Sequence, residues 1–350
     1  MNVRLQFSGP ARYRTKSAAL LFRAAVEVWL RRLRNGPRCA LWNFAAEIST
    51  EIAQRQLLTA FRMRDVKEAR SYLDAVAVHS SALRQVGIRN VVQGNFKGNW
   101  VTPKDQDSGV TILYLHGGGY AFYPRGFYNN LAAMIAFSAR AKLFAVDYRL
   151  SPEHKFPSQI EDAISAYRWL LSEGVDPRRL VVAGDSAGGN LTLALLLSLR
   201  DSKLPLPTLA ICLSPATDFE TNGAGAPGSS EYDWITQEMA MTWADWFCTP
   251  EQRSNPLVSP VNADLRGLPP MYIQAGGAEI LLPSIQLFVQ RAKAQGADVV
   301  LETWPAMNHD FQAFGEDVPQ SAEAIRRIGE VVASRILPRE RTANCNVTST

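Results

Sequence analysis

A serine between small residues is the strongest chemical signal in the sequence. Residues 184–188 read Gly-Asp-Ser-Ala-Gly, which fits the G-x-S-x-G pattern, and they lie between an apolar run and a helical stretch. In that setting a tight turn exposes the serine hydroxyl, and glycine leaves room on either side. The positive end of the following helix favours an oxyanion nearby. We therefore predict that Ser186 is the nucleophile of an acyl-transfer reaction.

Three consecutive glycines form the second signal. The sequence His116-Gly117-Gly118-Gly119-Tyr120 ends a predicted strand about 70 residues before Ser186. Glycines expose backbone N–H groups, and such groups stabilise the oxyanion of a tetrahedral intermediate. Because this loop precedes a nucleophile turn, as in esterases, we predict an oxyanion hole formed by the N–H groups of Gly118, Gly119 and Ala187.

The choice of a general base is narrow, because the chain has only four histidines. His309 follows the last predicted strand in an exposed loop, from which an imidazole can reach a serine hydroxyl. His79 lies in the N-terminal region, His116 begins the glycine loop and His154 lies in the segment SPEHKFP. We predict His309 as the base.

The acid that orients the base should stand between Ser186 and His309 in the chain. The candidates there include Asp218, Asp233, Asp245, Asp264, Glu279 and Asp298. Glu279 directly follows a predicted strand, so its carboxylate can meet Nδ1 of the histidine. Asp218, which follows an earlier strand, is the second choice.

These residues need a scaffold of alternating strands and helices. Apolar runs predict strands at 111–116, 142–148, 179–185, 209–215, 270–277 and 299–305, and helical spacing predicts helices at 127–139, 158–173, 189–200, 283–295 and 320–336. A hairpin around residues 91–101 and helices at 15–34 and 43–86 precede them. Such alternation is typical of a mostly parallel sheet with both faces covered.

The motifs, in their order, resemble the hormone-sensitive-lipase-like family of α/β-hydrolase esterases. They are HGGGY, DYRLSPEHKFP (147–157), GDSAGGN (184–190) and PLVSP (256–260), and the resemblance runs from about residue 110 to 314. It implies an α/β-hydrolase fold, with a mostly parallel eight-stranded sheet flanked by helices under a helical cap. A branch of this family carries Glu followed by Ile/Val-Leu-Leu at the acid position, as Glu279 does here.

The resemblance also suggests a division of the chain. Residues 1–88 would form an N-terminal helical cap region, 89–218 and 256–338 the catalytic domain, 219–255 a cap insertion and 339–350 a loose tail. The insertion is rich in aromatic residues, which can wall a pocket of limited depth. We expect Tyr120, Asp185, Trp243 and Trp246 to bind substrate, and the rate to be highest for butyryl or hexanoyl esters.

Charge and composition exclude several classes of protein. Residues 1–70 carry 14 Lys+Arg against 5 Asp+Glu, and the remainder carries 23 against 28. The body therefore lacks the basic surface of a nucleic-acid-binding protein. The basic N-terminus leaves three readings open: a helix packed on the body, contact with an anionic membrane, or a transit peptide. Four scattered cysteines without a CxxC pair predict neither a cysteine zinc site nor a disulfide scaffold.

We predict a cytoplasmic serine carboxylic-ester hydrolase that acts on short- to medium-chain acyl esters through an acyl-enzyme, without metal or cofactor. Its partner is a small-molecule ester, not nucleic acid. Alternatives are a membrane-associated lipase, an acetyl-ester (steryl or aryl) deacetylase, an amidase and a non-catalytic ligand-binding receptor. The resemblance also suggests a homodimer.

Overall fold

An eight-stranded sheet is the centre of the computed structural model, which describes residues 4–94, 96–220 and 232–336. The strand order is β10-β9-β8-β7-β5-β6-β4-β3. The strands are β3 (Val86–Gln93), β4 (Phe96–Pro103), β5 (Thr111–Leu115), β6 (Lys142–Asp147), β7 (Leu180–Asp185), β8 (Leu209–Leu213), β9 (Met271–Gly276) and β10 (Val299–Trp304). The adjacent strands of the run β10-β9-β8-β7-β5-β6 pair in parallel. Strand β4 is antiparallel to both of its neighbours, β3 and β6. The predicted fold, a mostly parallel eight-stranded sheet, is confirmed.

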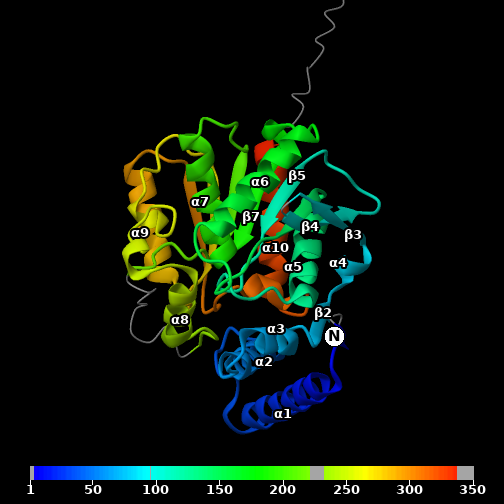
Figure 1. The fold of residues 1–350 in the computed structure, drawn as a ribbon. Coiled ribbons are helices and arrows are strands. Elements are labelled where there is room, and N and C mark those ends of the chain that lie inside the picture. The colour runs from blue at the N-terminus through cyan, green and yellow to red at the C-terminus, as the bar shows by residue number, and fades with distance from the viewer. Residues whose placement is uncertain (1–3, 95, 221–231, 337–350) are drawn as a thin grey trace, which may run out of the picture.

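Helices cover both faces of this sheet (Figure 1). One layer contains α5 (Arg125–Ala139) and α10 (Pro319–Ile336), and the other contains α6 (Ser158–Ser172), α7 (Ala187–Asp201) and α9 (Leu282–Ala294). The side chains of a strand alternate between the faces. In β5, Ile112 and Tyr114 pack with α5 and α10, whereas Leu113 and Leu115 pack with α6 and α7. Burial on both faces explains why these strands read as continuous apolar runs.

The predicted helix at 43–86 was wrong, because the segment contains four elements. They are α2 (Phe44–Phe61), α3 (Val66–Leu73), β2 (Val76–His79) and α4 (Ser81–Arg84). The Asp65 side chain caps α3 by accepting a hydrogen bond from the Lys67 N–H, which marks a new helix start. The β-branched Val76 and Val78 favour a strand, and β2 pairs antiparallel with β1 (Arg4–Phe7), a strand that the sequence analysis missed.

The N-terminal helices and α8 (Gln237–Phe247) lie together at one end of the sheet (Figure 1). Trp42, between α1 (Ala11–Asn35) and α2, packs with Met307 and Phe311 of the loop after β10, and its indole Nε1 donates to the Ala306 carbonyl over 2.9 Å. The N-terminal segment thus covers the loops that follow the parallel strands. The glycine-rich part of the predicted insertion and the predicted tail lie outside the described residues, and the domain boundaries remain a prediction.

Candidate active site

Ser186 occupies the turn between β7 and α7 in a conformation that is rare for a residue with a side chain. Its φ is +52° and its ψ is −117°. The Ser186 N–H donates to the Leu213 carbonyl over 2.8 Å, and its carbonyl accepts from the Asn190 N–H over 3.0 Å. A Cβ at Gly188 would lie 1.9 Å from the Leu115 carbonyl oxygen, so only glycine lets α7 approach β5 this closely. Packing therefore holds the strained turn in place, as is common at functional sites.

Asp185 joins this turn to the glycine loop. Its Oδ1 accepts hydrogen bonds from the Gly117 N–H over 2.9 Å and from the Tyr114 hydroxyl. The carboxyl group is fully buried, and burial together with the nearby charge of Asp310 raises the pKa of Asp185 well above its usual range. Asp185 borders neither cavity described below. The structure therefore places it as a support of the loop, whereas the sequence analysis expected a substrate contact.

Three backbone N–H groups are available beside Ser186. Among the described residues, no acceptor is bonded to the N–H of Gly118, Gly119 or Ala187. Gly119 has a φ of +61°, and a Cβ there would lie 2.7 Å from the ring of Trp243. This close packing holds the loop against α8. The predicted oxyanion donors therefore lie next to the serine with their hydrogen-bonding capacity unused.

Glu279 lies on the Nδ1 side of His309. Glu279 Oε1 is 3.9 Å from His309 Nδ1, and both side chains are fully buried. The other oxygen, Oε2, accepts from Ser214 Oγ over 2.6 Å and from the Gly276 N–H over 2.7 Å. These bonds fix the carboxylate where it can orient the imidazole. The 3.9 Å separation exceeds a hydrogen bond, and catalytic hydrogen bonds often shorten only when substrate is bound.

A second carboxylate lies on the other side of the imidazole. Asp310 Oδ2 is 3.2 Å from His309 Nε2. Burial alone would lower the pKa of His309, but the carboxylates of Asp310 and Glu279 outweigh it and raise the pKa well above its usual range. Each ring nitrogen of the base therefore faces a carboxylate, although neither is hydrogen-bonded to it among the described residues.

Asp233, on the segment before α8, is a site residue whose role the sequence analysis missed. Its Oδ1 accepts from the His309 N–H over 3.2 Å, and its Oδ2 accepts from the Ile280 N–H over 2.8 Å. Burial raises the pKa of Asp233 to about 6. The sequence made it a candidate partner of the imidazole, but in the structure it binds backbone. No local pattern indicates this role, because the two N–H groups come together only in the fold.

Trp234 adds a second link between this segment and the base. Its indole Nε1 donates to the His309 carbonyl over 2.6 Å, and the two rings lie 5.5 Å apart between centroids. Ser214, which follows β8, donates its hydroxyl to Glu279 Oε2 and accepts a hydrogen bond from the Asp310 N–H over 3.3 Å. Ser214 carried no signal in the sequence, and Trp234 was visible there only as one of the aromatic residues of the insertion.

His116 packs inside the protein as a support of the glycine loop. Its ring stacks between Tyr123 at 3.8 Å and Tyr148 at 4.1 Å, and burial lowers the pKa of His116 to about 3. The imidazole is therefore neutral at physiological pH. Its Nδ1 lies 2.7 Å from the Gly117 carbonyl oxygen, so the ring supports the glycine loop.

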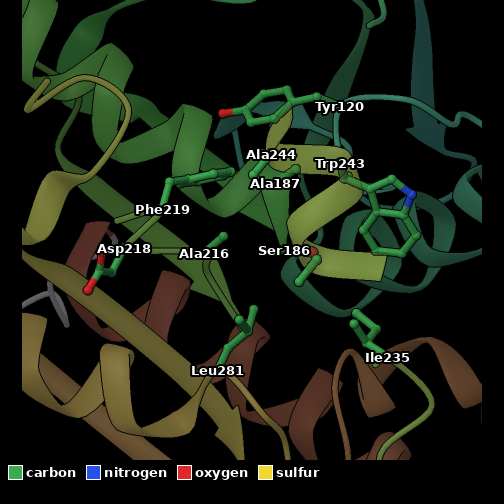
Figure 2. A pocket seen from close by; sticks show the side chains of 12 residues that line it. Tyr120, Ser186, Ala187, Ala216, Asp218, Phe219, Ile235, Trp243, Ala244 and Leu281 are labelled. Atoms are coloured by element: carbon green, nitrogen blue, oxygen red, sulfur yellow. The ribbon is translucent and has the colours of Figure 1, made fainter. Parts of the chain in front are cut away.

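Two cavities border Ser186. The smaller has a volume of about 50 Å³ and is lined by Gly119, Tyr120, Ser186, Ala187, Ala216, Asp218, Phe219, Ile235, Ala240, Trp243, Ala244 and Leu281 (Figure 2). The larger, of about 500 Å³, reaches His309 and Asp310 and extends among the N-terminal helices. Within the described residues, no group of three or more His, Cys, Asp or Glu side chains could hold a metal ion.

The other predicted contacts divide between these cavities. Trp243 borders both, and Tyr120 borders the smaller one, where its hydroxyl donates to Asn190 Oδ1 over 2.6 Å. Asp218 also borders the smaller cavity, and its carboxylate accepts from the Glu220 N–H. Trp246 borders neither cavity and packs on Phe122, with 6.4 Å between ring centroids.

Comparisons with known proteins agree with the fold described above. Residues 112–313 match a family described as having the alpha/beta hydrolase fold. An acetyl-hydrolase of Streptomyces hygroscopicus is 37% identical over 240 residues, which are 68% of this chain and 80% of the relative. A mutant of the esterase E40 superposes with a TM-score of 0.78 and 32% identity, covering 84% of this chain and 100% of that one. An esterase from the bacterial hormone-sensitive lipase (HSL) family superposes with a TM-score of 0.73 and 32% identity, covering 81% of this chain and 97% of that one.

Proposed function

This chain belongs to the α/β-hydrolase family, in its hormone-sensitive-lipase-like branch of esterases, and from that premise we propose that it hydrolyses carboxylic esters through Ser186. The observation that carries the proposal is the placement of Ser186. It lies on a strained turn beside three N–H groups that have no acceptor in the described part of the chain, and it borders a cavity that His309 also borders. This combination fits acyl transfer, in which a nucleophile, a base and oxyanion donors surround one carbonyl group.

The reaction has two steps. Ser186 attacks the acyl carbon while His309 accepts its proton, and the same imidazole then donates that proton to the leaving alcohol. Glu279 orients His309 and stabilises the imidazolium, and the N–H groups of Gly118, Gly119 and Ala187 bind the oxyanion. Water, activated by His309, then releases the acid and restores the serine. The acetyl-hydrolase among the relatives supports short acyl groups, and neither a metal nor a cofactor takes part.

Substitution of the serine tests this proposal. Ser186→Ala should remove nearly all hydrolysis of p-nitrophenyl acetate, because loss of a comparable serine lowers kcat by about 10⁶-fold. The thermal midpoint should stay close to that of the wild type, since only one small hydroxyl is removed. Activity above about one hundredth of the wild type would assign the reaction to another nucleophile. Tight binding of esters without turnover by the wild type would instead favour a non-catalytic receptor.

A second proposal concerns the N-terminal helix, which carries two apolar faces. Leu21, Ala24 and Val28 of α1 are buried against the rest of the protein. On the other side Phe22 is 73% exposed, Trp29 55% and Leu33 66%, at spacings that place them on one face. The helix contains seven Lys or Arg residues against one Glu. An exposed apolar face on a strongly basic helix fits the surface of an anionic membrane.

We infer that α1 lies on anionic membranes as a surface contact of a cytoplasmic enzyme. The three described cysteines are unpaired, as is usual in a reducing compartment. No helix in the described ranges is long and apolar enough to cross a membrane.

Vesicle binding tests this contact. The protein should co-sediment with phosphatidylglycerol-containing vesicles but not with pure phosphatidylcholine, and high salt should release it. The double variant Trp29→Ser, Leu33→Ser should lose this binding. The control variant Val92→Ser changes an apolar side chain of β3 that is 71% exposed, and it should retain the binding. Absence of binding by the wild type would overturn the proposal. Self-association that the double variant abolishes would assign the face to a second copy, as in a homodimer.

A further inference from the structure

The two cavities at Ser186 differ about tenfold in volume. The smaller measures about 50 Å³ and the larger about 500 Å³. Both include Gly119, Ser186, Ile235 and Trp243 in their walls. In Figure 2, Trp243 and Ile235 lie on one side of Ser186, and Ala216 and Phe219 lie on the other. An ester bound at Ser186 also has two halves, an acyl group and an alcohol, and each needs a space of its own.

The position of His309 decides which half occupies which cavity. During acylation the imidazole donates a proton to the oxygen of the leaving alcohol, so the alcohol must lie on the histidine side of the serine. His309 and Asp310 border the larger cavity only. The acyl group stays bonded to Ser186 and must occupy the remaining space, where Ala187, an oxyanion donor, forms part of the wall.

We propose, on the basis of the esterase function above, that the substrates are short-chain acyl esters of bulky, largely apolar alcohols. The smaller cavity accepts an acyl group of two to four carbons, the larger cavity accepts the alcohol, and Trp243 separates them.

The smaller cavity limits the acyl chain because its walls are packed. A water-sized group needs roughly 10–15 Å³ by this measure of volume, so the cavity holds only a few such groups. Trp243 packs so closely on the backbone of Gly119 that no Cβ would fit between them, and its ring lies edge-on to Phe122 with 6.2 Å between centroids. The wall also includes Leu281 and, on the same helix as Trp243, Ala240 and Ala244.

The larger cavity has the size and lining of a binding site for an apolar molecule. Its volume lies within the range of roughly 300–1,000 Å³ typical of small-molecule sites. The N-terminal helices contribute Leu21, Ile48, Ile52 and Leu57 to its wall, and the catalytic part contributes Phe122 and Phe127. Burial of apolar groups of the alcohol against these side chains would favour binding in proportion to the buried area. The N-terminal segment is therefore the part of the chain that selects the alcohol.

Two series of esters test the proposal. In the first, p-nitrophenyl esters vary from acetate to octanoate, and kcat/KM should fall at least about tenfold between butanoate and octanoate, which no longer fits. In the second, ethyl, hexyl and 2-cyclohexylethyl acetates vary the alcohol at similar leaving ability, and kcat/KM should rise at least about tenfold with the size of the alcohol. Faster turnover of octanoate, with no response to the alcohol, would place the acyl chain in the larger cavity and overturn the proposal.

Substitutions in the wall provide the matched controls. Trp243→Ala joins the two cavities, so the ratio of octanoate to acetate turnover should rise at least about tenfold. Trp246→Ala removes the same side chain from α8 outside both cavities, and its acyl preference should stay that of the wild type. If Trp243→Ala does not fold, Ala240→Leu fills the smaller cavity instead and should reduce butanoate turnover more than acetate turnover. An unchanged acyl preference in both Trp243→Ala and Ala240→Leu would show that α8 does not limit the acyl group.

The proposal and the proposed function fail in different ways. Loss of ester hydrolysis in Ser186→Ala, combined with a reversed preference in the two series, would leave the esterase function intact and reject only the assignment of the cavities. Full activity of Ser186→Ala would reject the esterase function itself.

Discussion

The carboxylate of Asp233 accepts a hydrogen bond from the backbone N–H of His309 over 3.2 Å. Its other oxygen binds the N–H of Ile280, the residue after Glu279, over 2.8 Å. One buried side chain before α8 therefore holds the loop of the base and the loop of the acid at a set separation. The chain runs from this segment directly into α8, where Trp243 separates the two cavities. The same stretch of chain therefore contributes to substrate selection and to the placement of the base.

Replacement of Asp233 should impair the base without removing a reacting group. In Asp233→Asn one oxygen becomes an amide N–H, which cannot accept from the N–H of Ile280. We expect kcat to fall roughly ten- to a hundredfold with KM little changed, because a small displacement of a catalytic group is costly. Steady-state kinetics with p-nitrophenyl acetate measures both constants. Equal loss of kcat and of folded protein would indicate a purely structural role.

Asp233 should also make stability depend on pH. Its pKa is raised to about 6 in the folded protein from an ordinary value of 3.8, so the folded state holds the proton more tightly than the unfolded chain. The resulting stabilisation is complete below about pH 4 and is lost as the pH rises through 6. The thermal midpoint of the wild type should therefore exceed that of Asp233→Asn by more at pH 4.5 than at pH 7.5. A constant difference would contradict the raised pKa.

Glu279 should matter more for turnover than Asp218 does. Glu279→Gln removes the anion facing the imidazolium, and we expect kcat to fall roughly 10²–10⁴-fold with a small change in KM. Asp218→Asn alters the wall of the smaller cavity and should change KM more than kcat. The comparison uses kcat and KM of the two variants on p-nitrophenyl acetate. The opposite ranking would move the role of the acid to Asp218.

The neighbouring acid should set the pH at which the base becomes active. His309 must be neutral to accept the serine proton, and the carboxylates of Asp310 and Glu279 raise its pKa against the effect of burial. In the pH profile of kcat/KM, the acidic limb should accordingly lie above the usual histidine pKa of about 6.5. Asp310→Asn should move that limb to lower pH, whereas Asp264→Asn, on the exposed surface, should leave it in place. A limb that Asp310→Asn does not move would exclude this influence on the base.

A methyl group in the glycine loop should disturb the oxyanion donors. Gly119 has a φ of +61°, and its Cβ would lie 2.7 Å from the Trp243 ring, so Gly119→Ala must displace the loop or the indole. We expect kcat to fall roughly 10²–10³-fold, as when an oxyanion donor is lost. Gly296→Ala is the matched control, because Gly296 has a φ of +80° but no atom within 4 Å of its Cβ. It should lose stability without losing kcat, and a similar kcat loss in both variants would argue for strain alone.

The sequence alone determined the family, the sheet and the order of the chemical groups. The turn at Ser186, the glycine loop and the loop of His309 each depend on residues adjacent in the chain, so their local pattern predicts them. The strands of the sheet were equally visible, since burial on both faces requires apolar runs. The roles of Ser186, Glu279 and His309 remain predictions that the geometry supports and that the substitutions above test.

Only the tertiary structure decided how these groups are held and what surrounds them. The pairing of β1 with β2, the bond from Asp233 to His309 and the contact of Asp310 with the base join segments or orient side chains in ways that no local pattern encodes. The volumes beside Ser186 likewise depend on α8 packing against the glycine loop and on the N-terminal helices covering the strand ends. The aromatic residues of the insertion predicted an optimum at butyryl or hexanoyl esters, whereas the packed position of Trp243 supports our proposal that acyl groups have at most about four carbons and that the larger space takes the alcohol.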